Sequence, residues 1–293
     1  MSRRTAAALL AVSAMDSHKT GSETALRSSI LSTFVTVPYT LPALRCAASG
    51  AAYTPSMRRY EEQGRLVTQI GSLPFSDVER AIAYSLEHDV PFLPELTVLG
   101  DAMLRYIQEP GRLSCLEAFK RHRFDTVKVQ CIGPATLLQS GYEEDAAITR
   151  IYAHIEAILD GLQAEETILF LDEPALGYAG FDYRRLWSPL FESFPVVRGV
   201  HVCGNMQWDH LFEAEIDIIS FDASKYDITK YYASRDGKRI AWGVERLEDV
   251  TDYRPGDLIT LPCGMPHRAY TEEQAEERFD TLRDVAQSLR RRG

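Results

Sequence analysis

The sequence is poor in three features that define whole classes of protein. It has five cysteines among 293 residues, an odd number without regular spacing, so we expect free thiols or metal ligands in a reducing cytoplasm rather than a disulfide framework. No stretch approaches the roughly 18 uninterrupted apolar residues of a membrane span. Basic residues are outnumbered, and the formal net charge is −10. This charge argues against nucleic acid and anionic membranes as main partners.

The first 56 residues differ in composition from the rest of the chain. They carry five basic and two acidic side chains and are rich in alanine, serine and threonine. Ala6–Ala14 is a short apolar run behind two arginines, a pattern that mimics a signal peptide. We favour two other interpretations, a poorly structured extension over residues 1–56 or a start codon assigned upstream of the true start at Met57. In either case the folded domain is expected over residues 57–293.

Hydrophobic residues make up 45% of the chain, which is enough for a large core, and from residue 65 onward they recur regularly. A short apolar run ends in polar, glycine or proline residues, a segment of helical period follows, and the next run begins. This alternation predicts a single (β/α)₈ TIM barrel, with a doubly wound open sheet as the alternative. The eight runs are Leu66–Ile70, Pro91–Leu96, Val127–Ile132, Ile168–Leu171, Gly199–Cys203, Ile216–Phe221, Arg239–Val244 and Leu258–Cys263.

Several of the intervening segments have the features of helices. Ser76–His88 opens with a serine and has Glu79 three residues later, the spacing of a capping box. Glu143–Ala164 has isoleucines and leucines at steps of three and four residues, which predicts an amphipathic helix. Thr271–Arg290 starts with a threonine and ends in arginines that suit the helix dipole. Shorter helices are predicted over Tyr183–Phe194, Gln207–Ala214 and Tyr226–Ala233.

The run Gly-Val-His-Val-Cys places two soft metal ligands at the end of a predicted strand. Residues two apart on a strand point to the same side, so His201 and Cys203 project together. Imidazole nitrogen and thiolate sulfur are donors that zinc prefers. Two further candidates, Cys263 and Asp222, end other apolar runs. The strand ends of a barrel converge on one face, so these four residues predict a zinc site; the alternative is that the cysteines pack as small hydrophobes.

Other runs also end in polar groups. The first continues as Ile70-Gly71-Ser72, where the glycine allows a ligand close to the backbone; the alternative is a turn before a helix. Glu95 ends the second run and, taken alone, is as readily a surface glutamate. The fourth run ends in Asp172 and Glu173, and two adjacent carboxylates are costly to bury without a partner. At least one of them is therefore expected to face the site.

Together these motifs make the chain resemble the catalytic C-terminal barrel of cobalamin-independent methionine synthase, within the wider superfamily related to uroporphyrinogen decarboxylase. The resemblance spans roughly Val67–His267. Each motif is weak alone, but their order and spacing are specific, and the decarboxylases lack the His-X-Cys with a late Cys-Gly. The motifs are Ile70-Gly71-Ser72-Leu73-Pro74, Gly133-Pro134-Ala135-Thr136, Asp172-Glu173-Pro174-Ala175, His201-Val202-Cys203 and Cys263-Gly264-Met265.

The resemblance implies a zinc-dependent methyltransferase that converts homocysteine to methionine. Carried over by position, His201, Cys203 and Cys263 would bind Zn²⁺. Zinc would hold the acceptor as a thiolate, which attacks a methyl group in an SN2 displacement. The family's fourth ligand is a glutamate, and the matching residue here is Asp222, which is one methylene shorter. If Asp222 does not reach the metal, the site has three protein ligands plus water or substrate.

The resemblance also implies how the small-molecule thiol binds. Glu95 and Asp172 would hold the amino group of the acceptor, and the Ile70-Gly71-Ser72 segment would hold its carboxylate. This pair of carboxylates favours homocysteine over coenzyme M, which has no ammonium group. A different thiol acceptor with a corrinoid donor is nevertheless an alternative.

The length of the chain departs from the family. Full-size methionine synthases of this type carry an additional N-terminal barrel that helps to bind a folate donor, and 293 residues leave no room for one. The chain resembles the short, single-barrel members, for which a methyl-corrinoid protein is a candidate donor. Two further alternatives are a non-catalytic barrel that binds a metal or a small ligand, and a metal-free lyase of the decarboxylase type.

Overall fold

The computed structural model describes residues 67–178, 182–204, 206, 208–235 and 237–291. The predicted extension over residues 1–56 lies outside the described residues and stays a prediction, as does the exact start of the folded domain. Among the helices in the described ranges, none is long and apolar enough to cross a membrane.

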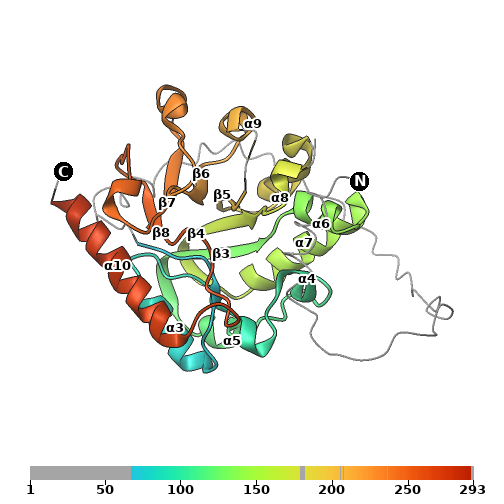
Figure 1. Cartoon of the computed structure of the whole chain (residues 1–293). Helices are drawn as coiled ribbons and strands as arrows, with labels where there is room; N and C mark the ends of the chain where they lie inside the picture. The colour runs from blue at the N-terminus through green and yellow to red at the C-terminus, as the bar shows by residue number, and fades with distance from the viewer. Residues whose placement is uncertain (1–66, 179–181, 205, 207, 236, 292–293) are drawn as a thin grey trace, which may run out of the picture. The chain divides into compact units, whose positions relative to one another are not determined.

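An all-parallel sheet of six strands lies at the centre of the described chain (Figure 1). Its strands follow one another in chain order from β3 to β8, without the order reversal that defines a doubly wound sheet. Two further strands, β1 (Ser72–Leu73) and β2 (Glu95–Leu96), form a separate parallel pair. The sheet strands are β3 (Arg123–Ile132), β4 (Gln163–Asp172), β5 (Val197–Val202), β6 (Ile218–Asp222), β7 (Arg239–Gly243) and β8 (Leu258–Thr260).

The prediction of a (β/α)₈ barrel is wrong, because the six strands form a curled half-barrel and no continuous ladder joins the remaining pair to it. Before β1, the chain meets β8 through a single bridge between Val67 and Ile259. Before β2, it meets β3 through another single bridge, between Phe92 and Lys128. The first two apolar runs therefore contribute strands of two residues each.

Side chains and prolines explain why these two runs do not extend the sheet. The Val67 N–H donates to the carboxylate of Asp89 at 3.0 Å, and the Gly71 N–H donates to the side chain of Gln130 at 2.7 Å. The second run contains prolines at positions 91 and 94, which have no N–H to donate. Backbone donors that a ladder requires are thus engaged elsewhere or missing.

The helices lie around the outside of the sheet (Figure 1). The two longest lie beside its opposite edges, α7 against β3 and α10 against β8, and α6, α7 and α8 pack against one another. The α-helices are α3 (Val78–Leu86), α4 (Met103–Tyr106), α5 (Leu116–Phe119), α6 (Pro134–Gln139), α7 (Glu144–Leu159), α8 (Tyr183–Glu192), α9 (Trp208–Glu213) and α10 (Glu272–Arg290). Short 3₁₀ segments are η1 (Thr97–Leu99), η2 (Leu176–Tyr178), η3 (Thr229–Ser234) and η4 (Leu247–Asp249).

Side-chain caps mark the starts of α3 and α10. Asp77, rather than the predicted Ser76, caps α3, because its carboxylate accepts a backbone N–H of the first turn at 2.8 Å. The threonine predicted to start the last helix is confirmed, since Thr271 and Gln274 form a capping box. The predicted helix over Tyr226–Ala233 is instead the 3₁₀ segment η3.

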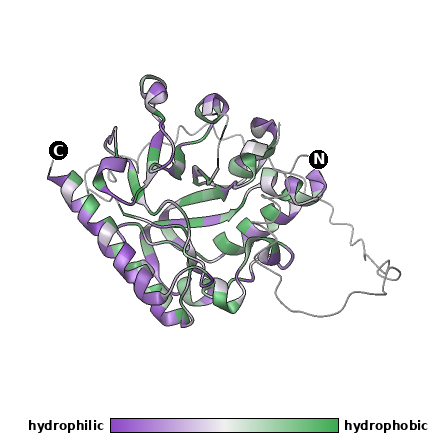
Figure 2. Cartoon of the chain, viewed as in Figure 1, coloured by the Kyte–Doolittle hydropathy of each residue, from purple (hydrophilic) through white to green (hydrophobic). Residues whose placement is uncertain are grey.

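The two faces of the sheet carry separate hydrophobic clusters. The larger one lies between the sheet and the helices. Figure 2 shows apolar residues, in green, on the strands and on the helices around them. The smaller one lies on the inner face of the curled sheet, and each large side chain in it contributes about 1.5–3 kcal/mol by its burial. Its members are Val90, Ile168, Phe170, Val197, Ile218, Ala241 and Leu258.

The register of the sheet sets a row of chemically different residues beyond the inner cluster. Phe170 pairs with Gly199, and a Cβ on that glycine would lie 2.9 Å from the phenylalanine ring, so only glycine fits there. Residues two positions further along each strand share the same face. In the next row, which approaches the carboxyl ends of the strands, Ile132, Asp172, His201 and Ser220 lie side by side, and Ala241 of the inner cluster follows them.

Candidate metal centre

His201, Cys203 and Cys263 come together at the carboxyl ends of β5 and β8, with His201 inside β5 and the two cysteines after the strands. Their ligand atoms all lie within 4.8 Å of one another. His201 Nε2 is 3.1 Å from Cys203 Sγ, and the two sulfurs are 3.9 Å apart. Among the residues that the structure describes, this is the group of three metal-ligating side chains that the fold assembles.

The spacing of these atoms fits a tetrahedral zinc ion. Zinc–sulfur bonds of about 2.3 Å and zinc–nitrogen bonds of about 2.0 Å set two sulfurs about 3.8 Å apart, and sulfur and nitrogen about 3.5 Å apart. The 3.9 Å between the sulfurs matches, and the 3.1 Å between nitrogen and sulfur requires only a small adjustment. Three protein ligands leave the fourth position of the tetrahedron to water or substrate, as in catalytic zinc sites.

A hydrogen bond with Ser220 orients the histidine ligand. His201 Nδ1 lies 3.0 Å from the Ser220 hydroxyl, which leaves Nε2 directed toward the sulfurs. The Cys203 thiol hydrogen-bonds to the sulfur of Cys263, and this bond lowers the pKa of Cys263 and raises the pKa of Cys203. Metal binding would therefore release a proton from the cysteine pair.

Asp222, the predicted fourth ligand, lies outside this group. One carboxylate oxygen accepts the backbone N–H of Ser224 at 3.1 Å and its hydroxyl at 2.6 Å. The other oxygen accepts the ammonium of Lys225 at 2.5 Å. The loop that follows β6 thus engages both oxygens, which favours the arrangement with three protein ligands.

Asp172 and Glu173 are adjacent buried carboxylates in opposite surroundings. Glu173 accepts the backbone N–H groups of Ala135 and Thr136, the Thr136 hydroxyl and the indole N–H of Trp187, at 2.7–3.0 Å. It therefore satisfies the first turn of α6. Asp172 is 0% exposed, and neither of its carboxylate oxygens has a hydrogen-bond partner in the described chain.

The electrostatics of Asp172 follow from this isolation. Burial raises its pKa to about 6, and the nearby His201 and Lys128 limit the rise. A buried carboxylate without a hydrogen-bond donor is costly to the fold. The arrangement therefore points to a ligand that donates to Asp172 when it is bound.

Glu95 and Lys128 lie near Asp172 and extend the same polar cluster. One oxygen of Glu95 makes no hydrogen bond of ordinary length within the described residues, and the other lies 3.4 Å from the Ser72 hydroxyl. Burial raises the pKa of Glu95 to about 8, and the negative charge of Asp172 adds to the rise. The Gln130 side chain also acts on this carboxylate and lowers its pKa. Burial lowers the pKa of Lys128 to about 8, while the two carboxylates oppose this change.

The Ile70-Gly71-Ser72 segment lies beside Glu95 and beside the residues that follow Cys263. Its central N–H is engaged by Gln130 at 2.7 Å, so that group is not available for a substrate carboxylate. The carbonyl of Ser72 accepts the N–H of Met265 at 2.7 Å, and a Cβ on Gly264 would lie 2.8 Å from the Ser72 Cβ. The close approach brings this segment to the residues that follow Cys263 in the chain.

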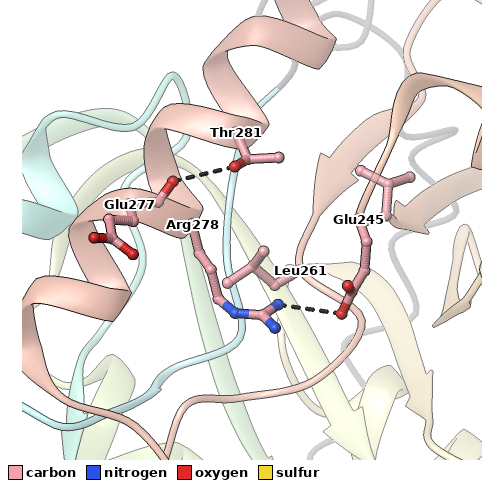
Figure 3. Close-up of a pocket in the computed structure, with 6 residues that line it drawn as sticks. Glu245, Leu261, Glu277, Arg278 and Thr281 are labelled. Atoms are coloured by element: carbon pink, nitrogen blue, oxygen red, sulfur yellow. Dashed lines mark hydrogen bonds and ion pairs between the residues drawn. The ribbon is translucent and has the colours of Figure 1, made fainter.

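A separate pocket lies between α10 and the ends of β7 and β8, with a volume of about 250 Å³ (Figure 3). The Arg278 guanidinium pairs there with the Glu245 carboxylate at 3.2 Å. The residues that line it are Val244, Glu245, Leu261, Glu277, Arg278 and Thr281. No predicted site residue lines this pocket.

Sequence reasoning did not assign roles to three polar residues of the inner face. Lys128 and Gln130 alternate with apolar residues inside the run Val127–Ile132, and this alternation was the available signal that they share one face. Ser220 precedes the end of another apolar run and gave no distinctive signal. Its role depends on the register between β5 and β6, which pairs it with His201.

Comparison with protein-family models found no match, and a search of curated proteins found no significant relative. The geometry of the candidate metal centre and of the carboxylates beside it is therefore the basis for a functional proposal.

Proposed function

We propose that the protein is a zinc-dependent methyltransferase that transfers a methyl group to a thiol, with homocysteine as the leading acceptor and methionine as the product. The observation that carries this proposal is the group of His201, Cys203 and Cys263 beside buried carboxylate oxygens without donors. Zinc bound there would supply a Lewis acid that keeps an acceptor thiol deprotonated near neutral pH.

The residues around the group would bind and orient the acceptor. Asp172 stands beside His201 in the sheet, so one small molecule can reach the carboxylate with its ammonium group and the metal ligands with its sulfur. The acceptor sulfur then forms a bond to the methyl carbon while the bond between that carbon and the donor breaks. Burial of Asp172 and Glu95 keeps water from competing for the ammonium group.

Two observations bear on the alternative functions. Unpartnered oxygens on two carboxylates disfavour an acceptor without an ammonium group, such as coenzyme M. A metal-free lyase of the decarboxylase type would leave the His-Cys-Cys group without a role. The alternative from another class is a protein that binds a metal or small ligand without turnover.

Both 5-methyltetrahydrofolate and a methyl-corrinoid protein stay candidate methyl donors for the proposed reaction. A cytoplasmic location belongs to the same proposal.

The proposal is tested by adding thiols and methyl donors to the zinc-loaded and metal-free protein. We expect homocysteine to release about one proton per chain at neutral pH only when zinc is bound, and 4-mercaptobutyrate, which lacks the ammonium group, to bind more weakly. Methyltetrahydrofolate and methylcobalamin are then supplied in turn, and methionine is measured. Tight thiol binding without methyl transfer from either donor would favour the non-catalytic alternative.

A further inference from the structure

Asp222 ends β6 on the face of the sheet that carries the metal-ligating group. It follows Ser220 by two residues, so the two side chains share a face, and the Ser220 hydroxyl lies 3.0 Å from His201 Nδ1. The register of β5 and β6 also sets Cys203, the first residue after β5, beside Asp222. The Asp222 side chain is only 5% exposed. A buried carboxylate thus lies next to the metal-ligating group without belonging to it.

The two oxygens of Asp222 have partners of different kinds. Oδ1 accepts the backbone N–H and the hydroxyl of Ser224, which ties the carboxylate to the loop after β6. Oδ2 accepts the ammonium group of Lys225 at 2.5 Å, and this is its one hydrogen bond from the described part of the chain. The Lys225 side chain is 70% exposed. A mobile group at the surface therefore occupies the buried oxygen that the loop backbone leaves open.

The contact with Lys225 determines what Oδ2 can do. Without it, Oδ2 would be a buried carboxylate oxygen that lacks a donor, and such an atom is costly to the fold. Coordination to zinc would remove that cost, because carboxylate oxygen is an ordinary zinc ligand. Four protein ligands would then fill the tetrahedron, as in structural zinc sites, whereas catalytic sites keep one position open.

We propose that Lys225 is a positioning residue that holds Asp222 away from the metal and so keeps the fourth coordination position open. Lys225 acts through the carboxylate and does not itself bind the metal. The part that concerns metal coordination is independent of any acceptor. The part that concerns entry of a thiol at the open position rests on the proposed function.

Zinc affinity tests the metal part directly. The zinc dissociation constant of the full chain is measured by competition with a chromophoric chelator for the wild type, Lys225→Met, Asp222→Asn and the double variant. We expect Lys225→Met to bind zinc at least about tenfold more tightly, because Asp222 becomes a fourth ligand, and the double variant to lose this gain. Asp222→Asn alone should change the affinity by less than about threefold.

Two outcomes of this cycle would overturn the proposal. One is an unchanged affinity in Lys225→Met. The other is a gain that persists in the double variant, because that gain would come from removing a positive charge near the metal and not from Asp222. Since Lys225 is largely exposed, its replacement should leave the fold intact.

Two further variants serve as controls. Lys225→Arg retains a cation that can donate to Asp222, so its zinc affinity should match the wild type within about threefold. Arg246 and Asp249 form a matched ion pair, also three residues apart, with side chains that are 71% and 4% exposed. Arg246→Met should leave zinc affinity unchanged. A gain there as large as in Lys225→Met would contradict a specific role for Lys225.

A spectroscopic readout reports on the fourth position itself. With cobalt in place of zinc, homocysteine should add sulfur-to-cobalt charge-transfer absorption in the wild type. Lys225→Met should need about tenfold more homocysteine for the same change, because the thiol must displace a carboxylate and not water. An identical response of both proteins would overturn the inference and leave the proposed function standing. If Lys225→Met gains affinity through Asp222 but homocysteine changes neither spectrum, the inference holds and the proposed function fails. A wild type that binds no zinc overturns both.

Discussion

The two carboxylates at the end of β4 show how the two sides of the sheet differ. Glu173 accepts four hydrogen bonds from α6 and Trp187, whereas its neighbour Asp172 accepts none from the described chain. Both are buried to the same degree. The outer side therefore uses a buried charge to hold a helix in place, and the inner side retains a buried charge that the fold alone does not satisfy.

The two carboxylates differ in whether the fold supplies their hydrogen-bond donors. A carboxylate with a full set of donors stabilises the fold, and its loss leaves several donors unsatisfied. A carboxylate without donors is a cost that a bound ligand can remove. The inner side also holds the metal-ligating group, so its unsatisfied atoms and its reactive atoms are neighbours in the sheet.

The largest expected effect is the loss of zinc from the inner side. Cys203→Ser and Cys263→Ser each remove one of three ligands, so we expect zinc affinity to fall at least about a hundredfold. Cys131→Ser is the matched control, because Cys131 is fully buried in the outer cluster. It should lower stability but leave about one zinc per chain by elemental analysis. Zinc retained in both site variants would contradict the assignment.

The carboxylate pair gives the next largest effect. Glu173→Gln should destabilise the protein by about 2–4 kcal/mol, because an amide cannot accept all four hydrogen bonds. Asp172→Asn should not destabilise the protein by more than about 1 kcal/mol, since no hydrogen bond is lost and a buried charge without a donor is removed, yet it should weaken homocysteine binding. Urea denaturation and thiol titration measure the two effects. If Asp172→Asn destabilised the protein more than Glu173→Gln, the proposed difference between the inner and outer sides of the sheet would be wrong.

Glu95, a buried carboxylate of the inner side, should make the stability of the protein depend on pH. Burial raises its pKa from 4.5 to about 8 in the folded protein, so its protonated form favours folding. This contribution is complete below the unfolded pKa and is lost as the pH rises through the folded pKa. Glu95→Gln cannot ionise, so the variant's advantage over the wild type should grow between about pH 5 and pH 8. Parallel urea-unfolding profiles of the metal-free proteins would contradict this expectation.

The smallest effect is expected at the pocket of Figure 3. Arg278 and Glu245 form an ion pair with side chains that are 32% and 51% exposed. Exposed pairs contribute little, so Arg278→Met should change stability by less than about 1 kcal/mol and leave zinc content and thiol binding unchanged. A loss of thiol binding in this variant would indicate that the acceptor binds at this pocket, and would contradict its proposed position beside the metal centre.

The sequence predicted the parts of the site that depend on single strands. His201 and Cys203 are two residues apart, and their common direction follows from strand geometry alone. Their approach to Cys263 depends on the sheet bringing β5 and β8 together, which the repeated pattern of runs and helices indicated. The β3–β8 segments were recognisable for the same reason, because short apolar runs bounded by polar, glycine or proline residues alternate there with segments of helical period.

The parts that depend on pairing between strands could not be predicted. The register that places Asp172 beside His201, and His201 beside Ser220, is a property of neighbouring strands and leaves no mark in either sequence. The predicted closed barrel was wrong at the first two runs. Backbone N–H groups there bond to side chains, or proline lacks the N–H. Lys128 was overlooked because an isolated lysine usually indicates an exposed position.

X-ray absorption at the zinc edge, recorded on the loaded protein with and without homocysteine, tests the central claim most directly. We expect two sulfur ligands and one imidazole nitrogen per zinc, with a light atom in the fourth position that is replaced by a third sulfur when homocysteine is added. A spectrum without protein sulfur, or one that homocysteine does not change, would contradict a metal centre that activates a thiol.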